Sequence, residues 1–121
     1  MDRLEAVMNE LREFVAEREW QQFHDHKNLA MAIASEAGEL LAEYRWISNA
    51  EADQFTKSEN RCKRIAEEAA DIGIALLLFC DRVGIDLFDV IREKMIGNRR
   101  NYPVELSRGK AEKPNRLGKT D

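Results

Sequence analysis

Two pairs of carboxylates, each with a spacing of three residues, are the residues of this sequence best suited to chemistry. Glu36 and Glu39 form the first pair, and Glu68 and Asp71 form the second. On a helix, this spacing places both side chains on one side, about one turn apart. The second pair lies in an apolar segment, where an ionised carboxylate is costly unless a cation or hydrogen bonds compensate. Two such helices packed antiparallel would therefore form a cluster of four carboxylates.

A four-carboxylate cluster would offer only oxygen ligands to a metal ion. Such ligands suit a hard ion, Mg²⁺ or Mn²⁺, rather than zinc or copper. A di-iron site would need Glu-x-x-His pairs, but the only histidines, His24 and His26, lie outside both carboxylate pairs. Protein-bound Mg²⁺ usually keeps several waters and also binds phosphate oxygens, so the pattern indicates phosphate chemistry. With no glycine-rich phosphate-binding loop in the sequence, metal and side chains would have to hold the phosphates.

A solvated acidic surface is the competing interpretation of these residues. Taken alone, Glu36 and Glu39 fit the exposed edge of a helix, and the chain would then be a helical interaction module with a non-catalytic acidic face. The apolar neighbours of Glu68 and Asp71 count against that alternative, because docking of a partner needs exposed charges.

Helices must position these carboxylates, because six glycines and two prolines are too few for a chain of strands and tight turns. Apolar residues at three- and four-residue spacing predict helices over about residues 2–19, 29–44, 57–83 and 87–102, with a short helical turn between the second and third. Residues 65–79 are apolar almost all the way round, which is typical of the central helix of a bundle. The sequence therefore predicts an all-α bundle.

Capping residues mark the ends of these predicted helices. Asp2 and Asp86 are suited to begin the first and fourth helices, and Gly84 to end the third. Capping boxes are expected at Ser48 with Glu51 for the short turn, and at Thr56 with Glu59 for the third helix. We expect residues 1–103 to form a single helical domain, and the less apolar residues 104–121 to form an extended arm or disordered tail.

Length, charge and cysteine count exclude several classes of protein. The chain has 121 residues, 44% of them hydrophobic, and a formal net charge of −4, which suits one domain and argues against broad nucleic-acid binding. No apolar window is long enough for a membrane span, and the charged start at residues 1–5 does not suit a signal peptide. Two cysteines, Cys62 and Cys80, are too few for a disulfide scaffold. A cytoplasmic protein without nucleic-acid or membrane partners is expected.

With these features, the sequence resembles the all-α MazG-like nucleoside triphosphate pyrophosphohydrolases. The carboxylate pairs look like the metal signature of that family, and the resemblance covers roughly residues 20–109. Other matching stretches bring it nearest to the short dCTP-pyrophosphatase-like branch: residues 20–24, 27–32, 38–41, 71–72, 84–87 and 102–104, with Trp46, Lys94 and Asn98. Their order and spacing together carry the resemblance.

The resemblance implies a four-helix bundle that assembles into homodimers or homotetramers. It also implies hydrolysis of a nucleoside triphosphate, dCTP or a related deoxynucleotide, to a monophosphate and pyrophosphate. By similarity, Glu36, Glu39, Glu68 and Asp71 would hold Mg²⁺, with Mn²⁺ as a possible substitute. Glu36, with Glu39 beside it, would act on the attacking water. The resemblance further implies a set of substrate-binding residues: Trp20, Phe23, Lys27, Asn28, Trp46, Lys94, Asn98 and Tyr102.

Two positions depart from the pattern of that branch. Ala75 stands one turn after Asp71, where relatives that prefer dCTP can carry a larger aromatic residue, so the preferred base and sugar stay open. His26 stands where a proline is common, in the loop before the second helix. A related pyrophosphohydrolase of the phosphoribosyl-ATP type is an alternative, although the two tryptophans and the Lys27–Asn28 pair favour the deoxynucleotide reaction.

Overall fold

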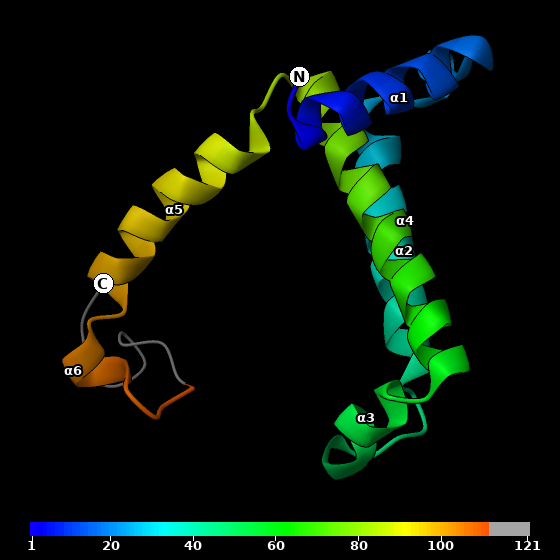
Figure 1. The fold of residues 1–121 in the computed structure, drawn as a ribbon. Helices are drawn as coiled ribbons and strands as arrows, with labels where there is room; N and C mark the ends of the chain where they lie inside the picture. The colour runs from blue at the N-terminus through cyan, green and yellow to red at the C-terminus, as the bar shows by residue number, and fades with distance from the viewer. Residues whose placement is uncertain (112–121) are drawn as a thin grey trace. The chain divides into compact units, whose positions relative to one another are not determined.

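The computed structural model of the chain describes residues 1–111, and this part is helical with no strand. Figure 1 shows the elements in chain order: α1 (Arg3–Glu17), η1 (Trp20–Phe23), α2 (His26–Glu43), α3 (Asn49–Thr56), α4 (Glu59–Val83), α5 (Leu87–Asn101) and α6 (Val104–Ser107). The predicted all-α fold class is therefore confirmed. None of the described helices is long and apolar enough to cross a bilayer. The chain divides into two compact units, Met1–Ile85 and the part from Asp86 onward.

Helices α2 and α4 form an antiparallel pair that is the centre of the first unit (Figure 1). Two contacts define their register. The rings of His26 and Phe79 meet edge to face at 6.4 Å near one end, and the Arg64 guanidinium lies 3.5 Å from the Glu43 carboxylate near the other. Because residue numbers rise along α2 as they fall along α4, Glu36 is brought opposite the segment that contains Glu68.

Helix α1 lies across the C-terminal end of α4 (Figure 1). The Arg12 guanidinium joins the two helices by donating to the Asp81 carboxylate, at 2.6 Å for the shortest contact. After α1, Glu19 adopts a left-handed backbone conformation with φ of 53°, which costs a non-glycine residue about 1–2 kcal/mol. This turn carries η1 back along α1, where the Trp20 ring packs edge to face on Phe14 at 5.6 Å.

Helix α3 lies at the opposite end of the α2–α4 pair and contacts α4. The predicted capping box at Thr56 and Glu59 is wrong, because Thr56 ends α3 and Ser58 caps α4 through the backbone N–H of Arg61. The Thr56 hydroxyl instead bonds the Tyr44 hydroxyl at 2.6 Å and the Ala52 carbonyl at 2.9 Å. Thr56 therefore ties α3 to the end of α2 rather than starting the next helix.

The other predicted helix ends agree more closely with the structure. The carboxylates of Asp2 and Asp86 accept from backbone N–H groups in the first turns of α1 and α5, and Gly84 ends α4 with φ of 85°. Ser48 precedes α3 as predicted, but its hydroxyl donates to the Glu51 carboxylate at 2.8 Å and makes no bond to the backbone. Asp25, which was not among the predicted caps, caps α2 by accepting from the Asn28 N–H.

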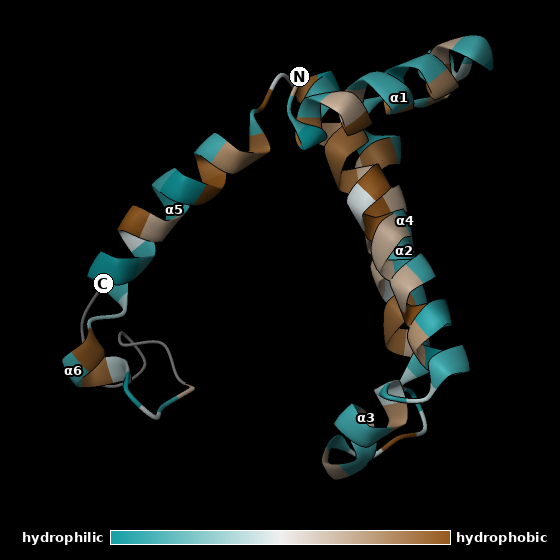
Figure 2. Cartoon of the chain, in the orientation of Figure 1, coloured by the Kyte–Doolittle hydropathy of each residue, from teal (hydrophilic) through white to brown (hydrophobic). Residues whose placement is uncertain are grey.

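The buried core of the described chain is small. Four apolar residues are buried: Val15, Leu29, Ala75 and Cys80. Figure 2 shows that α4 is hydrophilic in its first turns and more apolar toward its C-terminal half, yet Ile74 in that half remains 42% exposed. The two thiols are free, with Cys62 exposed and Cys80 buried. The segment predicted for the centre of a bundle therefore leaves apolar surface accessible.

The second unit contains α5 and the single-turn helix α6. Asp86 begins α5, and Tyr102 follows its last residue with its N–H bonded to the Asn98 carbonyl. Pro103 precedes α6, so residues 104–107 form a helical turn. The proposed single domain over residues 1–103 and arm over 104–121 remain a prediction, and residues 112–121 lie outside the described part of the chain.

Candidate functional site

A cluster of three carboxylates lies between α2 and α4. Glu36 of α2 and Glu68 and Asp71 of α4 each place one carboxylate oxygen within 4.8 Å of the others. Glu68 and Asp71 share one side of α4 because they are three residues apart, and the antiparallel register brings Glu36 to them. The structure thus joins three of the four carboxylates that the sequence suggested as metal ligands.

Negative charge is concentrated at Glu68. The pKa of Glu68 is raised above its usual value, first by loss of water around its carboxylate and then by repulsion from Asp71, Glu39, Glu36 and Glu43. Nearby positive charge comes from Arg64, which pairs with Glu43 at 3.5 Å. Oxygen donors held together against their own repulsion fit a hard divalent cation, because such an ion would neutralise the charge that raises the pKa.

The four predicted ligands differ in their exposure and in whether they belong to the group of close carboxylate oxygens. Glu36 and Glu68 are half-buried, but Asp71 is exposed, so the expected burial of the second pair is wrong for Asp71. Within the first unit, α4 packs mainly against α2, so an apolar stretch of sequence does not by itself bury Asp71. Glu39 is not part of the close group, although it is near enough to raise the pKa of Glu68. Its role as a ligand or catalytic group stays a prediction.

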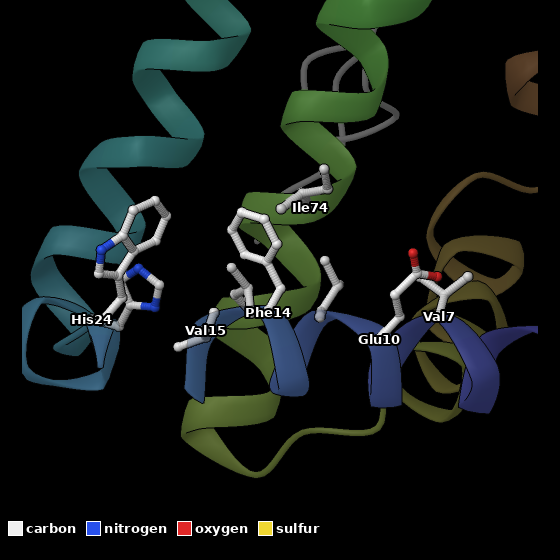
Figure 3. Close-up of a pocket in the computed structure, with 9 residues that line it drawn as sticks. Val7, Glu10, Phe14, Val15, His24 and Ile74 are labelled. Atoms are coloured by element: carbon white, nitrogen blue, oxygen red, sulfur yellow. The ribbon is translucent and has the colours of Figure 1, made fainter. Parts of the chain in front are cut away.

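An apolar pocket of about 440 Å³ lies in the angle between α1 and α4, beside η1 (Figure 3). Nine residues line this pocket: Val7, Glu10, Leu11, Phe14, Val15, Trp20, His24, Ile74 and Leu78. Ile74 lies one helical turn after Asp71 on the same side of α4, since the two are three residues apart. The pocket is therefore adjacent to the carboxylate cluster along α4.

Two ionisable side chains line this otherwise apolar pocket. Figure 3 shows His24 and Glu10 on opposite sides of Phe14, with Ile74 above Phe14 on α4. Trp20, a predicted substrate-binding residue, is 42% exposed and forms part of the wall. Glu10 and Phe14 were not predicted from the sequence as site residues. Their spacing of four residues on α1 was the available signal, but it could not show that η1 folds back beside them.

Four further residues of the first unit were predicted to bind substrate. Phe23 is 58% exposed and Trp46, in the turn after α2, is 87% exposed, so neither ring is enclosed by the described chain. Lys27 is exposed in the first turn of α2. The Asn28 amide donates to the Phe23 carbonyl at 3.1 Å, which links α2 to η1. None of these four lines the pocket, and their substrate-binding roles stay predictions.

The remaining predicted residues belong to the second unit. Lys94 and Asn98 lie four residues apart on α5, and Tyr102 follows this helix, so the three are separated by successive turns. Lys94 is exposed and Asn98 is half-buried. Their proposed contacts with phosphate and sugar stay predictions.

The chain is similar to a known protein family and to individual proteins. Residues 31–117 match the MazG-like family. The chain is 39% identical over 108 residues to dCTP pyrophosphatase 1 of Rattus norvegicus and 36% identical over 110 residues to that of Homo sapiens, matches that cover 89% and 91% of this chain. It spans 64% and 65% of the length of these two relatives.

A solved structure is similar in both fold and sequence. A pyrophosphatase from Archaeoglobus fulgidus DSM 4304 superposes with a TM-score of 0.80 and 36% identity, covering 85% of this chain and 94% of that protein. The likeness therefore extends over almost the whole of that protein. Together with the match over residues 31–117, it shows that the chain belongs to the MazG-like family.

Proposed function

We propose that this chain is a Mg²⁺-dependent nucleoside triphosphate pyrophosphohydrolase acting on deoxynucleotides, with dCTP or a related or modified nucleotide as substrate. The observation that carries the proposal is the position of three clustered carboxylates one helical turn from an apolar pocket lined by Trp20. The names of the relatives, dCTP pyrophosphatase 1 and pyrophosphatase, support the same reaction class. The reaction would serve to clear such nucleotides from the cytoplasmic pool.

The proposed ligands of the cation are Glu36, Glu68 and Asp71, with Glu39 as a fourth carboxylate nearby. The donor set is composed of oxygen atoms alone, which favours Mg²⁺ and allows Mn²⁺. Bound Mg²⁺ would neutralise charge on the phosphate oxygens and make a nearby water more acidic. A cation also explains how a chain of net charge −4 can bind a polyanionic substrate.

The chain's own catalytic task is to position and deprotonate the attacking water. Water adds across the bond between the α and β phosphates, which gives the monophosphate and pyrophosphate. We assign the acceptance of the proton to Glu36 or Glu39, because Glu36 is in the cluster and Glu39 lies one turn away, outside the group of close oxygens. A carboxylate oxygen that is not bound to the cation would be free to take that proton.

The pocket is suited to the nucleoside part of the substrate. Its volume of about 440 Å³ lies within the range of small-molecule sites. Trp20 and Phe14 offer aromatic surfaces on which a base can stack. Because Ile74 of the pocket is one turn from Asp71, a nucleotide whose phosphates lie at the carboxylates can place its base in the pocket.

Replacing Trp20 by alanine tests this placement. Loss of base stacking is expected to raise KM for the nucleotide about tenfold or more, with a smaller change in kcat. Gln21→Ala is the control, since Gln21 is exposed on the same short helix and does not line the pocket. The measurement is steady-state kinetics together with the melting temperature of each variant. Equal effects of the two substitutions on KM would contradict this assignment of the pocket.

We also propose that the chain works as a homodimer or homotetramer. Several large apolar side chains are exposed: Phe23, Met31, Leu41, Trp46, Phe88, Ile91, Ile96 and Val104. Such surface is typical of chains that cover it by association. Light scattering of the purified protein should give a mass of two or four times 14.0 kDa. A mass of one chain at micromolar concentration would rule this proposal out.

A product assay decides the proposed function. Each dNTP is incubated with the protein and Mg²⁺, and monophosphate, pyrophosphate and orthophosphate are measured separately. Monophosphate and pyrophosphate in equal amounts are expected, with dCTP among the substrates. Release of orthophosphate alone, or no turnover of any dNTP with Mg²⁺ or Mn²⁺, would overturn the proposal. No turnover would also restore the alternative of a non-catalytic acidic surface.

A further inference from the structure

Glu10 is the acidic side chain of the apolar pocket and has no role in the proposed metal chemistry. It projects from α1 on the same side as Phe14 (Figure 3) and lines the pocket with it. Among residues 1–111, its carboxylate has neither a hydrogen-bond partner nor an ion-pair partner. A free carboxylate at the wall of an apolar pocket is available to accept hydrogen bonds from a ligand.

The basic residue closest to Glu10 along α1 is already engaged. Arg12 donates to the Asp81 carboxylate of α4 and to the Asn9 side chain at 3.2 Å. These bonds hold the guanidinium on α4. Glu10 and Arg12 are two residues apart on α1, so they also lie on different sides of this helix. Glu10 is therefore left to face the pocket while Arg12 fastens the helix that carries it.

We propose that Glu10 is a specificity-determining residue, which selects nucleotides whose base presents an exocyclic amino group. This inference rests on the proposed pyrophosphohydrolase function and on the base occupying the pocket. An ionised carboxylate only accepts hydrogen bonds. The 4-amino group of cytosine donates to such an acceptor, whereas the 4-keto oxygen of uracil or thymine is itself an acceptor and is repelled.

The arrangement of the wall supports this role. Phe14 lies one turn from Glu10 on α1 and contacts Trp20 edge to face, so the aromatic surfaces and the carboxylate belong to one wall. A base stacked against this wall presents its edge, rather than its ring face, to side chains at either side. Figure 3 places Glu10 and His24 at those two sides. Glu10 can then read the base edge without contact to the phosphates.

The experiment compares dCTP with dUTP, which differ in the group at position 4 of the base and in the proton on N3. The kcat/KM values for both are measured with wild type, Glu10→Gln and Glu10→Leu. Glu13→Gln is the matched control, because Glu13 is an exposed glutamate on the same helix that does not line the pocket. Wild type is expected to prefer dCTP. Both Glu10 variants should lower the ratio of dCTP to dUTP activity at least about fivefold, mainly through dCTP, and Glu13→Gln should leave it within about twofold.

Each other outcome has a definite meaning. A wild type that is active but prefers dUTP, or Glu10 variants with an unchanged ratio, would overturn the role of Glu10 and leave the proposed function standing. An equal change in the Glu13→Gln control would show a general charge effect and also overturn it. A wild type that hydrolyses neither nucleotide to monophosphate and pyrophosphate, nor any other dNTP, would overturn both the proposed function and this inference.

Discussion

Replacing Glu68 by glutamine is expected to lower kcat/KM for the nucleotide by more than about 100-fold and, in the metal-free protein, to raise the melting temperature. The activity falls because the neutral amide is a poor ligand for a divalent cation, whose charge stabilisation contributes several kcal/mol to such reactions. The stability rises because the ionised Glu68 carboxylate has lost water around it and is repelled by Asp71, Glu39, Glu36 and Glu43. A substitution that lowers activity and raises stability is expected at a site where function requires like charges to lie close together.

The neighbouring residue provides a matched control for this prediction. Glu67→Gln makes the same chemical change one position away, at an exposed residue that is not part of the carboxylate cluster. It should change kcat/KM less than about threefold. Activity is measured by pyrophosphate release, and stability by thermal unfolding in the presence of a chelator. If Glu68→Gln kept most of the activity, or if both variants lost it equally, the cluster would not be the metal site.

Much of this site was predictable from residue spacing. The intervals within the two carboxylate pairs predict a shared cluster if their two helices pack antiparallel, and the structure brings Glu36 to Glu68 and Asp71 in this way. The caps Asp2, Asp86 and Gly84 were predictable because each acts within one turn of the backbone. Residue spacing and capping residues thus predict the helices, their main boundaries and most of the carboxylate cluster.

The pocket depends on contacts that local spacing does not encode. It exists because α1 crosses the end of α4, where Arg12 binds Asp81, 69 positions away in the sequence. It also depends on the left-handed turn at Glu19, a conformation that few glutamates adopt. Neither the crossing of α1 over α4 nor the turn at Glu19 can be predicted from the helical spacing of apolar residues. Glu10 therefore reads as one more solvated residue in the sequence, although the structure places it in the wall of a pocket.

Thr56 and Asp71 show why two other expectations were wrong. Thr56 has the residue type and spacing of a cap, but its hydroxyl contacts Tyr44 and Ala52, so Ser58 takes the capping position. Asp71 lies in an apolar segment that predicts burial, yet it is exposed in the described chain. In both cases the outcome was decided by which neighbour packs against the residue, and this is tertiary information.

Removal of divalent metal is expected to abolish turnover completely, and added Mg²⁺ to restore it. The same ion should stabilise the fold, because a ligand that binds only the folded chain adds about 2.7 kcal/mol to the free energy of unfolding at 100 times its Kd. Glu68→Gln should lose most of this stabilisation, since it removes one of the three clustered carboxylates. Thermal unfolding with chelator and with increasing Mg²⁺ measures the effect. An active chelated enzyme would contradict the metal requirement.

The stability of the chelated protein should also depend on pH in a direction set by Glu68. Its pKa in the folded chain is raised above the ordinary value of 4.5, so the folded state binds a proton more tightly than the unfolded state does. The contribution of Glu68 to the free energy of unfolding is therefore largest below about pH 4.5. This contribution is lost as the pH rises through the raised pKa. Saturating Mg²⁺ should abolish the loss, because the cation replaces the proton as the partner of the carboxylate. Melting temperatures are measured from about pH 4.5 upward, once with chelator and once with Mg²⁺. The two sets of values should diverge as pH rises, and their difference should be small in Glu68→Gln. Parallel curves for wild type would show that the cation does not bind at this carboxylate.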